Sequence, residues 1–139
     1  MQIIPYLSFE GNATEAIELY KKALGAKDMG IMHYGDNPGT KEQYPEYAEK
    51  VLHAELKVGD GLMYISDTMP EGKIDIGTNM AININFDSDE ALNLAFDTLA
   101  VDGDVLTPLN DTFWGARYGM VNDRFGNGWS LNYQYPEKK

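Results

Sequence analysis

Residues 80–99 read MAININFDSDEALNLAFDTL, a strand pattern followed directly by a helix pattern. From Met80 to Phe86, apolar residues alternate with smaller or polar ones, which predicts a strand with one buried face. Ser88 can accept a hydrogen bond from the first turn of the helix that follows. The apolar residues of that helix recur at helical spacing and are Ala91, Leu92, Leu94, Ala95, Phe96 and Leu99.

The same strand–helix unit occurs earlier in the chain. An offset of 75 residues (91 − 16 = 75) places Ala16 on Ala91 and aligns the apolar residues of the two helices. Asn12 can cap the earlier helix, and Gly25 suits its C-terminal end. Three more strands are predicted after each helix. The eight expected strands cover residues 3–9, 28–35, 51–58, 62–66, 80–86, 104–107, 116–122 and 128–135.

The order of elements is therefore βαβββ, repeated once. We expect modules at 1–68 and 78–135, a linker at 69–77, and one α+β domain over residues 1–139. Neither module can bury an apolar face alone, so the two should pair into a curved mixed sheet with a helix on each outer flank. Such a sheet forms a cup, and the concave side of a cup is where a ligand is expected.

Composition limits the possible partners. The chain has 22 acidic and 11 basic residues, a net charge of -11, which disfavours nucleic acid and anionic membrane surfaces. The absence of cysteine excludes disulfides and thiolate chemistry and agrees with a cytoplasmic location. No apolar run approaches the roughly 20 residues that span a bilayer, and the N-terminus lacks the pattern of a signal peptide.

Three stretches carry a family resemblance: PYLSFEGNATEAIELYKKALGA (5–26), HAELKVGDGLMYISD (53–67) and WGARYGMVNDRFGNGW (114–129). With them the chain resembles the vicinal oxygen chelate superfamily, which includes glyoxalase I, extradiol dioxygenases and bleomycin-resistance proteins, and most closely its PhnB-like subgroup. In the third stretch the subgroup usually has Asp, Pro and His where this chain has Ala116, Arg124 and Asn127.

The resemblance implies a divalent metal held by four strand residues, which fall here on Pro5, Tyr64, Ala81 and Ser130. Pro and Ala side chains have no donor atom, and neutral hydroxyls bind divalent ions weakly. We therefore expect the superfamily's fold without its metal site, and no other cofactor.

Side chains alternate along strands, so residues that share the face of Tyr64 should line the cup. By this alternation the first strand contributes Phe9, and the third strand contributes His53 and Glu55. The predicted ligand-binding residues are Phe9, His53, Tyr64, Asn83, Asn85, Trp114 and Arg117. The catalytic candidates are His53 and Glu55, because an imidazole beside a carboxylate can act as a general base. Trp129 falls on the opposite, helix-facing side.

Several of these residues have a structural alternative. His53 can be an ordinary structural histidine, and Asn83 with Asn85 can simply form a solvated sheet face. Arg117 can clamp an anionic ligand or pair with one of the 22 acids, and Asp67 can hold Arg117 or merely end a strand.

Two classes of function remain open. The first is a metal-free protein that binds a small organic molecule in the cup, as a homodimer. The alternative is a metal-dependent lyase, isomerase or dioxygenase with relocated ligands, for which His33, His53 and Glu55 are the available donors. A methyltransferase label is also attached to relatives of this subgroup, but the chain has no glycine-rich turn after an apolar strand.

Overall fold

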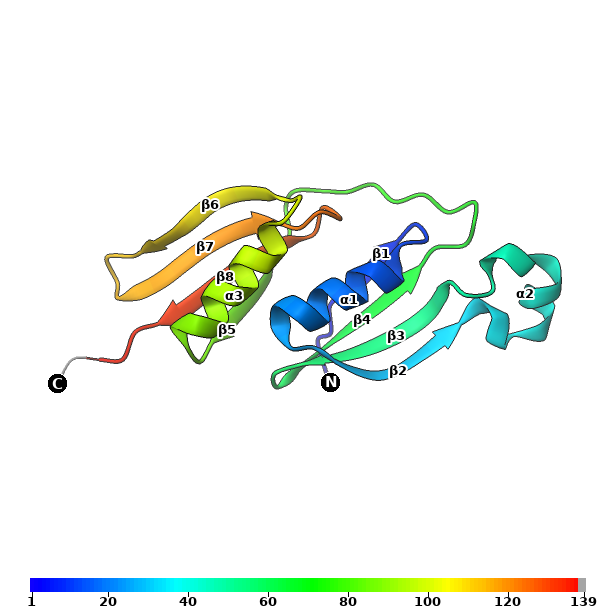
Figure 1. Ribbon diagram of the computed structural model, residues 1–139, viewed down its shortest axis with the longest axis horizontal. Coiled ribbons are helices and arrows are strands. Elements are labelled where there is room, and N and C mark those ends of the chain that lie inside the picture. The colour runs from blue at the N-terminus through cyan, green and yellow to red at the C-terminus, as the bar shows by residue number, and fades with distance from the viewer. Residues whose placement is uncertain (138–139) are drawn as a thin grey trace. The chain divides into compact units, whose positions relative to one another are not determined.

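The computed structural model describes residues 1–137, which fall into two compact units (Figure 1). One unit comprises Met1–Lys21 and Gly25–Asp75, and the other comprises Lys22–Leu24 and the chain from Ile76 onward. Each unit contains one four-stranded mixed sheet. The α+β class and the two βαβββ modules are thus confirmed, with one sheet for each module.

The first sheet has the strand order β1-β4-β3-β2, in which β1 runs parallel to β4 and the other neighbours are antiparallel. Its strands are β1 (Tyr6–Phe9), β2 (Lys27–His33), β3 (Val51–Val58) and β4 (Gly61–Asp67), and the helix after β1 is α1 (Ala13–Leu24). The polar excursion between β2 and β3 forms η1 (Tyr34–Asp36), α2 (Pro38–Gln43) and η2 (Pro45–Tyr47).

The second sheet repeats this arrangement with the order β5-β8-β7-β6, and β5 runs parallel to β8. Its strands are β5 (Ile82–Phe86), β6 (Asp104–Asp111), β7 (Ala116–Asn122) and β8 (Gly128–Gln134), and its helix is α3 (Asp89–Ala100). None of the helices within residues 1–137 is long and apolar enough to cross a membrane.

Alternation along β4 and β8 divides each sheet into a buried and an accessible face. Met63 and Ile65 are buried on β4, and Trp129 and Leu131 are completely buried on β8. Their neighbours at even-numbered positions are half-buried. In the second unit α3 packs on β7 and β8, and its buried Leu92 and Leu99 supply the matching apolar stripe. The predicted core position of Trp129 is confirmed.

The N-terminus of α1 is capped by a residue from another element. The side chain of Asn12 makes no capping hydrogen bond. Instead, the carboxylate of Asp67, at the end of β4 and 1% exposed, accepts hydrogen bonds from the backbone N–H groups of Gly11, Ala13 and Val51, each at 2.9 Å. The predicted role of Asn12 is wrong, because a buried carboxylate offers stronger acceptors to the free N–H groups of a helix. Ser88, by contrast, caps α3 as predicted, through Ala91 N–H at 3.1 Å.

The connection between β7 and β8 agrees with the expected strands, the first of which ends at residue 122 and the second of which begins at residue 128. Gly128 pairs with Asn122 in the strands. The connection is a five-residue loop, 123–127, in which the buried carboxylate of Asp123 accepts from the N–H groups of Phe125 and Asn127 and from the Trp129 indole. These hydrogen bonds define the loop.

Candidate functional site

The register of β1 against β4 decides which residues share the accessible face of the first sheet. Tyr6 lies opposite Tyr64, Leu7 opposite Ile65, and Phe9 opposite Asp67. Opposed residues share a face, so Tyr6 joins Tyr64 while Phe9 lies on the buried side. Phe9 is only 3% exposed. The placement of Phe9 on the ligand face was wrong by one residue, and such a slip moves every side chain of a strand to the other face.

The accessible face of this sheet carries three rings in mutual contact, which we call the Tyr6–His53–Tyr64 cluster. The centroid of the His53 ring lies 4.7 Å from that of Tyr64 and 5.5 Å from that of Tyr6. The two tyrosine rings lie 5.7 Å apart in an edge-to-face arrangement. The Tyr6 hydroxyl and His53 Nδ1 are hydrogen-bonded at 2.8 Å.

A β-bulge explains how His53 reaches this face. Val51 and His53 are two residues apart, yet Val51 is fully buried and His53 is only half-buried. The ladder with β2 is irregular here: Met32 pairs with His53, while His33 pairs with Val51. The extra residue, Leu52, is therefore 38% exposed. Further along β3, Glu55 lies opposite Tyr64 and so shares the face of the cluster, as predicted.

The cluster can offer a ligand two kinds of contact. Tyr6 is 52% exposed, so its ring can contact a flat apolar molecule. The imidazole uses one nitrogen toward the Tyr6 hydroxyl, and its other nitrogen, Nε2, can donate or accept according to the tautomer. Glu55 adds a carboxylate to the same face.

The accessible face of the second sheet is polar, as predicted for Asn83 and Asn85. Asn83 lies opposite Ser130 and Asn85 opposite Asn132. Ser130 Oγ donates to Asn83 Oδ1 at 3.0 Å, and Asn83 Nδ2 donates to Asn85 Oδ1 at 3.1 Å. The two asparagines thus belong to one hydrogen-bonded network.

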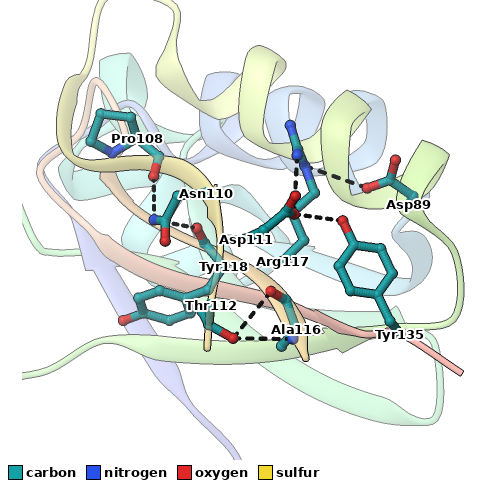
Figure 2. Close-up of polar contacts among 9 residues, drawn as sticks. All are labelled: Asp89, Pro108, Asn110, Asp111, Thr112, Ala116, Arg117, Tyr118 and Tyr135. Carbon is teal, nitrogen blue, oxygen red and sulfur yellow. Dashed lines mark hydrogen bonds and ion pairs between the residues drawn. The ribbon is translucent and has the colours of Figure 1, made fainter. Parts of the chain in front are cut away.

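Arg117 lies among acids within the second unit (Figure 2). Its Nε is 3.5 Å from Asp89 Oδ1 and its Nη1 is 3.4 Å from Asp111 Oδ1. The Tyr135 hydroxyl donates to the same Asp111 oxygen at 2.6 Å. Partial burial lowers the pKa of Arg117, but the hydrogen bond with Tyr135 and the two carboxylates outweigh it and leave the pKa raised. The alternative in which Arg117 pairs with acids describes this geometry better than an anion clamp does, and the pairing is with Asp89 and Asp111 rather than Asp67.

Trp114 lies in the connection between β6 and β7 of the second unit. It follows β6 in the turn before β7, where it is 55% exposed and packs edge-to-face on Phe113, which is 98% exposed. This places two aromatic rings at the tip of a hairpin.

The residues at the superfamily's metal positions do not fit a metal ion. The positions implied by the superfamily, Pro5, Tyr64, Ala81 and Ser130, supply no imidazole or carboxylate. His33 and His53 lie on neighbouring strands, but their different pairing partners direct them to opposite faces. Within residues 1–137 no three His, Asp or Glu side chains gather as a metal-binding group would require.

Comparison with known proteins agrees with the fold. The model of the family described as 3-demethylubiquinone-9 3-methyltransferase matches residues 1–132. The chain belongs to this PhnB-like family. Protein YjdN of Escherichia coli K12 is 30% identical over 142 residues, which covers 95% of each chain.

Similar solved structures extend the comparison. Protein PA1353 of Pseudomonas aeruginosa is 36% identical, with a TM-score of 0.83 over 96% of this chain and 98% of that one. A PhnB protein of Bacillus cereus is 25% identical, with a TM-score of 0.79 over 96% and 99%. At 12% identity and a TM-score of 0.62, a glyoxalase/bleomycin resistance protein/dioxygenase family enzyme of Burkholderia phytofirmans shares the fold alone, over 94% of this chain and 97% of its own. The chain thus shares the fold of a glyoxalase/bleomycin resistance protein/dioxygenase family enzyme, in agreement with the fold expected from the motifs.

Tyr6 is the residue of the cluster that sequence reasoning missed. Its apolar neighbours Pro5 and Leu7 show no clear alternation of apolar and polar residues. The faces of this strand were therefore assigned from Pro5, which puts Phe9 rather than Tyr6 beside Tyr64. The feature of the sequence that could have identified Tyr6 is its hydroxyl group, because a tyrosine in a strand rich in apolar residues needs a polar partner for that hydroxyl.

Proposed function

We propose that this PhnB-like chain binds a small organic molecule at the Tyr6–His53–Tyr64 cluster, without a catalytic metal. The observation that carries the proposal is the hydrogen bond between the Tyr6 hydroxyl and His53 Nδ1 at 2.8 Å, made on an accessible sheet face between two tyrosine rings. A homodimer in the cytoplasm belongs to the same proposal.

The cluster has the chemistry of a ligand site rather than of a core. Aromatic rings contribute most to stability when they are buried, yet Tyr6 leaves half of its surface exposed. The hydrogen bond with Tyr6 fixes the orientation of the imidazole before any ligand arrives. A site that is ordered in advance loses less conformational entropy on binding.

The rival function, a metal-dependent lyase, isomerase or dioxygenase, requires a group of donor side chains, and none gathers within residues 1–137. Hydroxyl groups from Tyr64 and Ser130 cannot replace imidazole and carboxylate donors. The methyl transfer named in the family description would need a site for a methyl donor. The connection from β1 to α1, Glu10-Gly11-Asn12, has a single glycine and gives no support for such a site.

The proposal can be tested by NMR titration of the full chain with neutral aromatic alcohols, such as benzyl alcohol and 4-methylbenzyl alcohol. We expect saturable shifts centred on Tyr6, His53 and Tyr64. Tyr64→Ala should abolish them, whereas Tyr44→Ala, which removes a tyrosine ring elsewhere in the first unit, should leave them unchanged. Shifts that ignore the cluster, or survive Tyr64→Ala, would contradict the proposal. Elemental analysis of the same sample, washed in moderate salt, should give no stoichiometric Zn, Fe, Ni or Mn.

A further inference from the structure

The second sheet presents two rows of side chains on its accessible face. Strand register places Met120, Ser130 and Asn83 side by side in one row, and Tyr118, Asn132 and Asn85 in the next. We call these six residues the amide face. They come from β7, β8 and β5, and all belong to the second unit.

The composition of the amide face is unusual for this chain. Charged residues make up 24% of the sequence, and the net charge is -11, yet all six residues are uncharged. Asparagine is disfavoured within strands, but three asparagines occupy strand positions here. An accessible sheet face can be solvated by Thr, which favours strands, or by Lys or Glu, which disfavour them less than asparagine does. Departures from local preference without a gain in packing are expected at functional sites.

Hydrogen bonds orient the amides of this face. Ser130 Oγ donates to Asn83 Oδ1, which turns Asn83 Nδ2 toward Asn85 Oδ1. Asn132 Nδ2 approaches the same Asn85 oxygen at 3.5 Å. These contacts use neither Asn85 Nδ2 nor Asn132 Oδ1. A donor and an acceptor thus stand on neighbouring strands, at positions fixed by the network.

From this arrangement we propose that the amide face binds a neutral ligand bearing a carboxamide or lactam group. Asn85 Nδ2 donates to the ligand carbonyl, and Asn132 Oδ1 accepts from the ligand N–H. Tyr118, opposite Asn132, supplies a ring against which a flat ligand can lie. A carboxylate ligand lacks the N–H and carries a charge that this acidic chain repels.

Residue-specific NMR on the full chain with three matched probes tests the proposal: benzamide, methyl benzoate and benzoate. Benzamide offers both a donor and an acceptor, the ester only an acceptor, and benzoate only charged acceptors. We expect benzamide at millimolar concentration to shift the side-chain amide signals of Asn85 and Asn132, with the other two probes at least roughly tenfold weaker. Equal shifts from all three probes, or no saturable shift from benzamide, would overturn the proposal.

Two variants that add the same negative charge distinguish loss of the contact between Asn85 and the ligand from a general electrostatic effect. Asn85→Asp replaces the donor by a carboxylate oxygen and should weaken benzamide binding roughly tenfold. Asn93→Asp, on α3, should leave binding unchanged. Loss of binding in both variants, or in neither, would count against the assignment. The amide face and the Tyr6–His53–Tyr64 cluster belong to different units. Benzamide shifts at Asn85 should therefore persist in Tyr64→Ala, which distinguishes failure of this inference from failure of the proposed function.

Discussion

The Tyr6 hydroxyl meets His53 Nδ1 at 2.8 Å across 47 residues of sequence and across an intervening strand. Tyr6 lies on β1 and His53 on β3, and β4 runs between them. Alternate strands lie roughly 10 Å apart, so only long side chains on the same face can meet, and here they do so beside the ring of Tyr64. The bond therefore depends on the register of two separate strand pairs.

Replacing Tyr6 by Phe should remove the hydrogen bond to the His53 imidazole while keeping the aromatic ring at position 6. We expect the free energy of unfolding to change by less than about 1 kcal/mol, because the bond is solvent-exposed. The nitrogen-15 resonances of the His53 ring should shift, since Nδ1 loses its partner. Tyr64→Phe, at a residue that contacts His53 through its ring, is the matched control. Identical His53 spectra in wild type and Tyr6→Phe would show that the bond is not formed in solution.

Asp67→Asn should destabilise the protein by about 3 kcal/mol, measured by urea denaturation. The carboxylate joins the end of β4 to the start of α1 and of β3 through three backbone N–H groups. The asparagine side chain keeps one acceptor oxygen but replaces the other by an NH₂ group. This NH₂ group then faces a backbone N–H, so that two buried donors meet without an acceptor. Asp60→Asn, in the exposed turn before β4, should cost less than about 0.5 kcal/mol. Similar losses in the two variants would argue against this role for Asp67.

Tyr34 should make stability depend on pH above about 10. Its hydroxyl donates to the Asp67 carbonyl at 2.7 Å, and its pKa is raised above 10.0 by burial, by the Asp67 carboxylate and by Tyr6. The folded state then holds the proton more tightly than the unfolded state. The stabilisation is complete below the unfolded pKa and is lost as pH rises through the folded pKa.

Tyr34→Phe should therefore lower the free energy of unfolding by about 1 kcal/mol at neutral pH. Its stability should also fall less steeply than that of wild type above about pH 10. Urea denaturation at a series of pH values measures both effects. Parallel profiles for the two proteins above pH 10 would contradict the assignment.

The exposed tip formed by Phe113 and Trp114 predicts a homodimer. Two large rings that are 98% and 55% exposed on a single chain are typical of a surface that another chain covers. Sedimentation at micromolar concentration should give twice the 15.5 kDa of one chain. Phe113→Ser combined with Trp114→Ser should shift the protein toward the monomer. A wild-type protein that sediments only as 15.5 kDa would exclude the dimer.

The two modules are expected to unfold together as one domain over residues 1–139. Each carries its own four-stranded sheet, yet the repeated pattern predicts that neither is stable alone. Limited proteolysis in the linker at 69–77 should therefore yield no folded fragment. Recovery of a stable, folded piece that ends near Gly77 would show two independent domains.

Local sequence determined the order of elements and the buried face of most strands. Alternation is a property of neighbouring residues, so the buried positions of Ile65, Trp129 and Leu131 could be read directly from the sequence. The same reasoning placed His53 and Glu55 on the face of Tyr64. It also identified Ser88 as a helix cap, because a cap bonds to a residue only three positions away.

Tertiary structure decided the contacts that join distant segments. Tyr6 rather than Phe9 lies beside Tyr64, because a short parallel strand takes its register from its neighbour and not from its own pattern. Asp67 rather than Asn12 caps α1, across 54 residues, and Arg117 meets Asp89 and Asp111 only once α3, β6 and β7 are assembled. Each outcome depends on which of several suitable partners the fold brings near, and the spacing of residues along the chain does not contain that information.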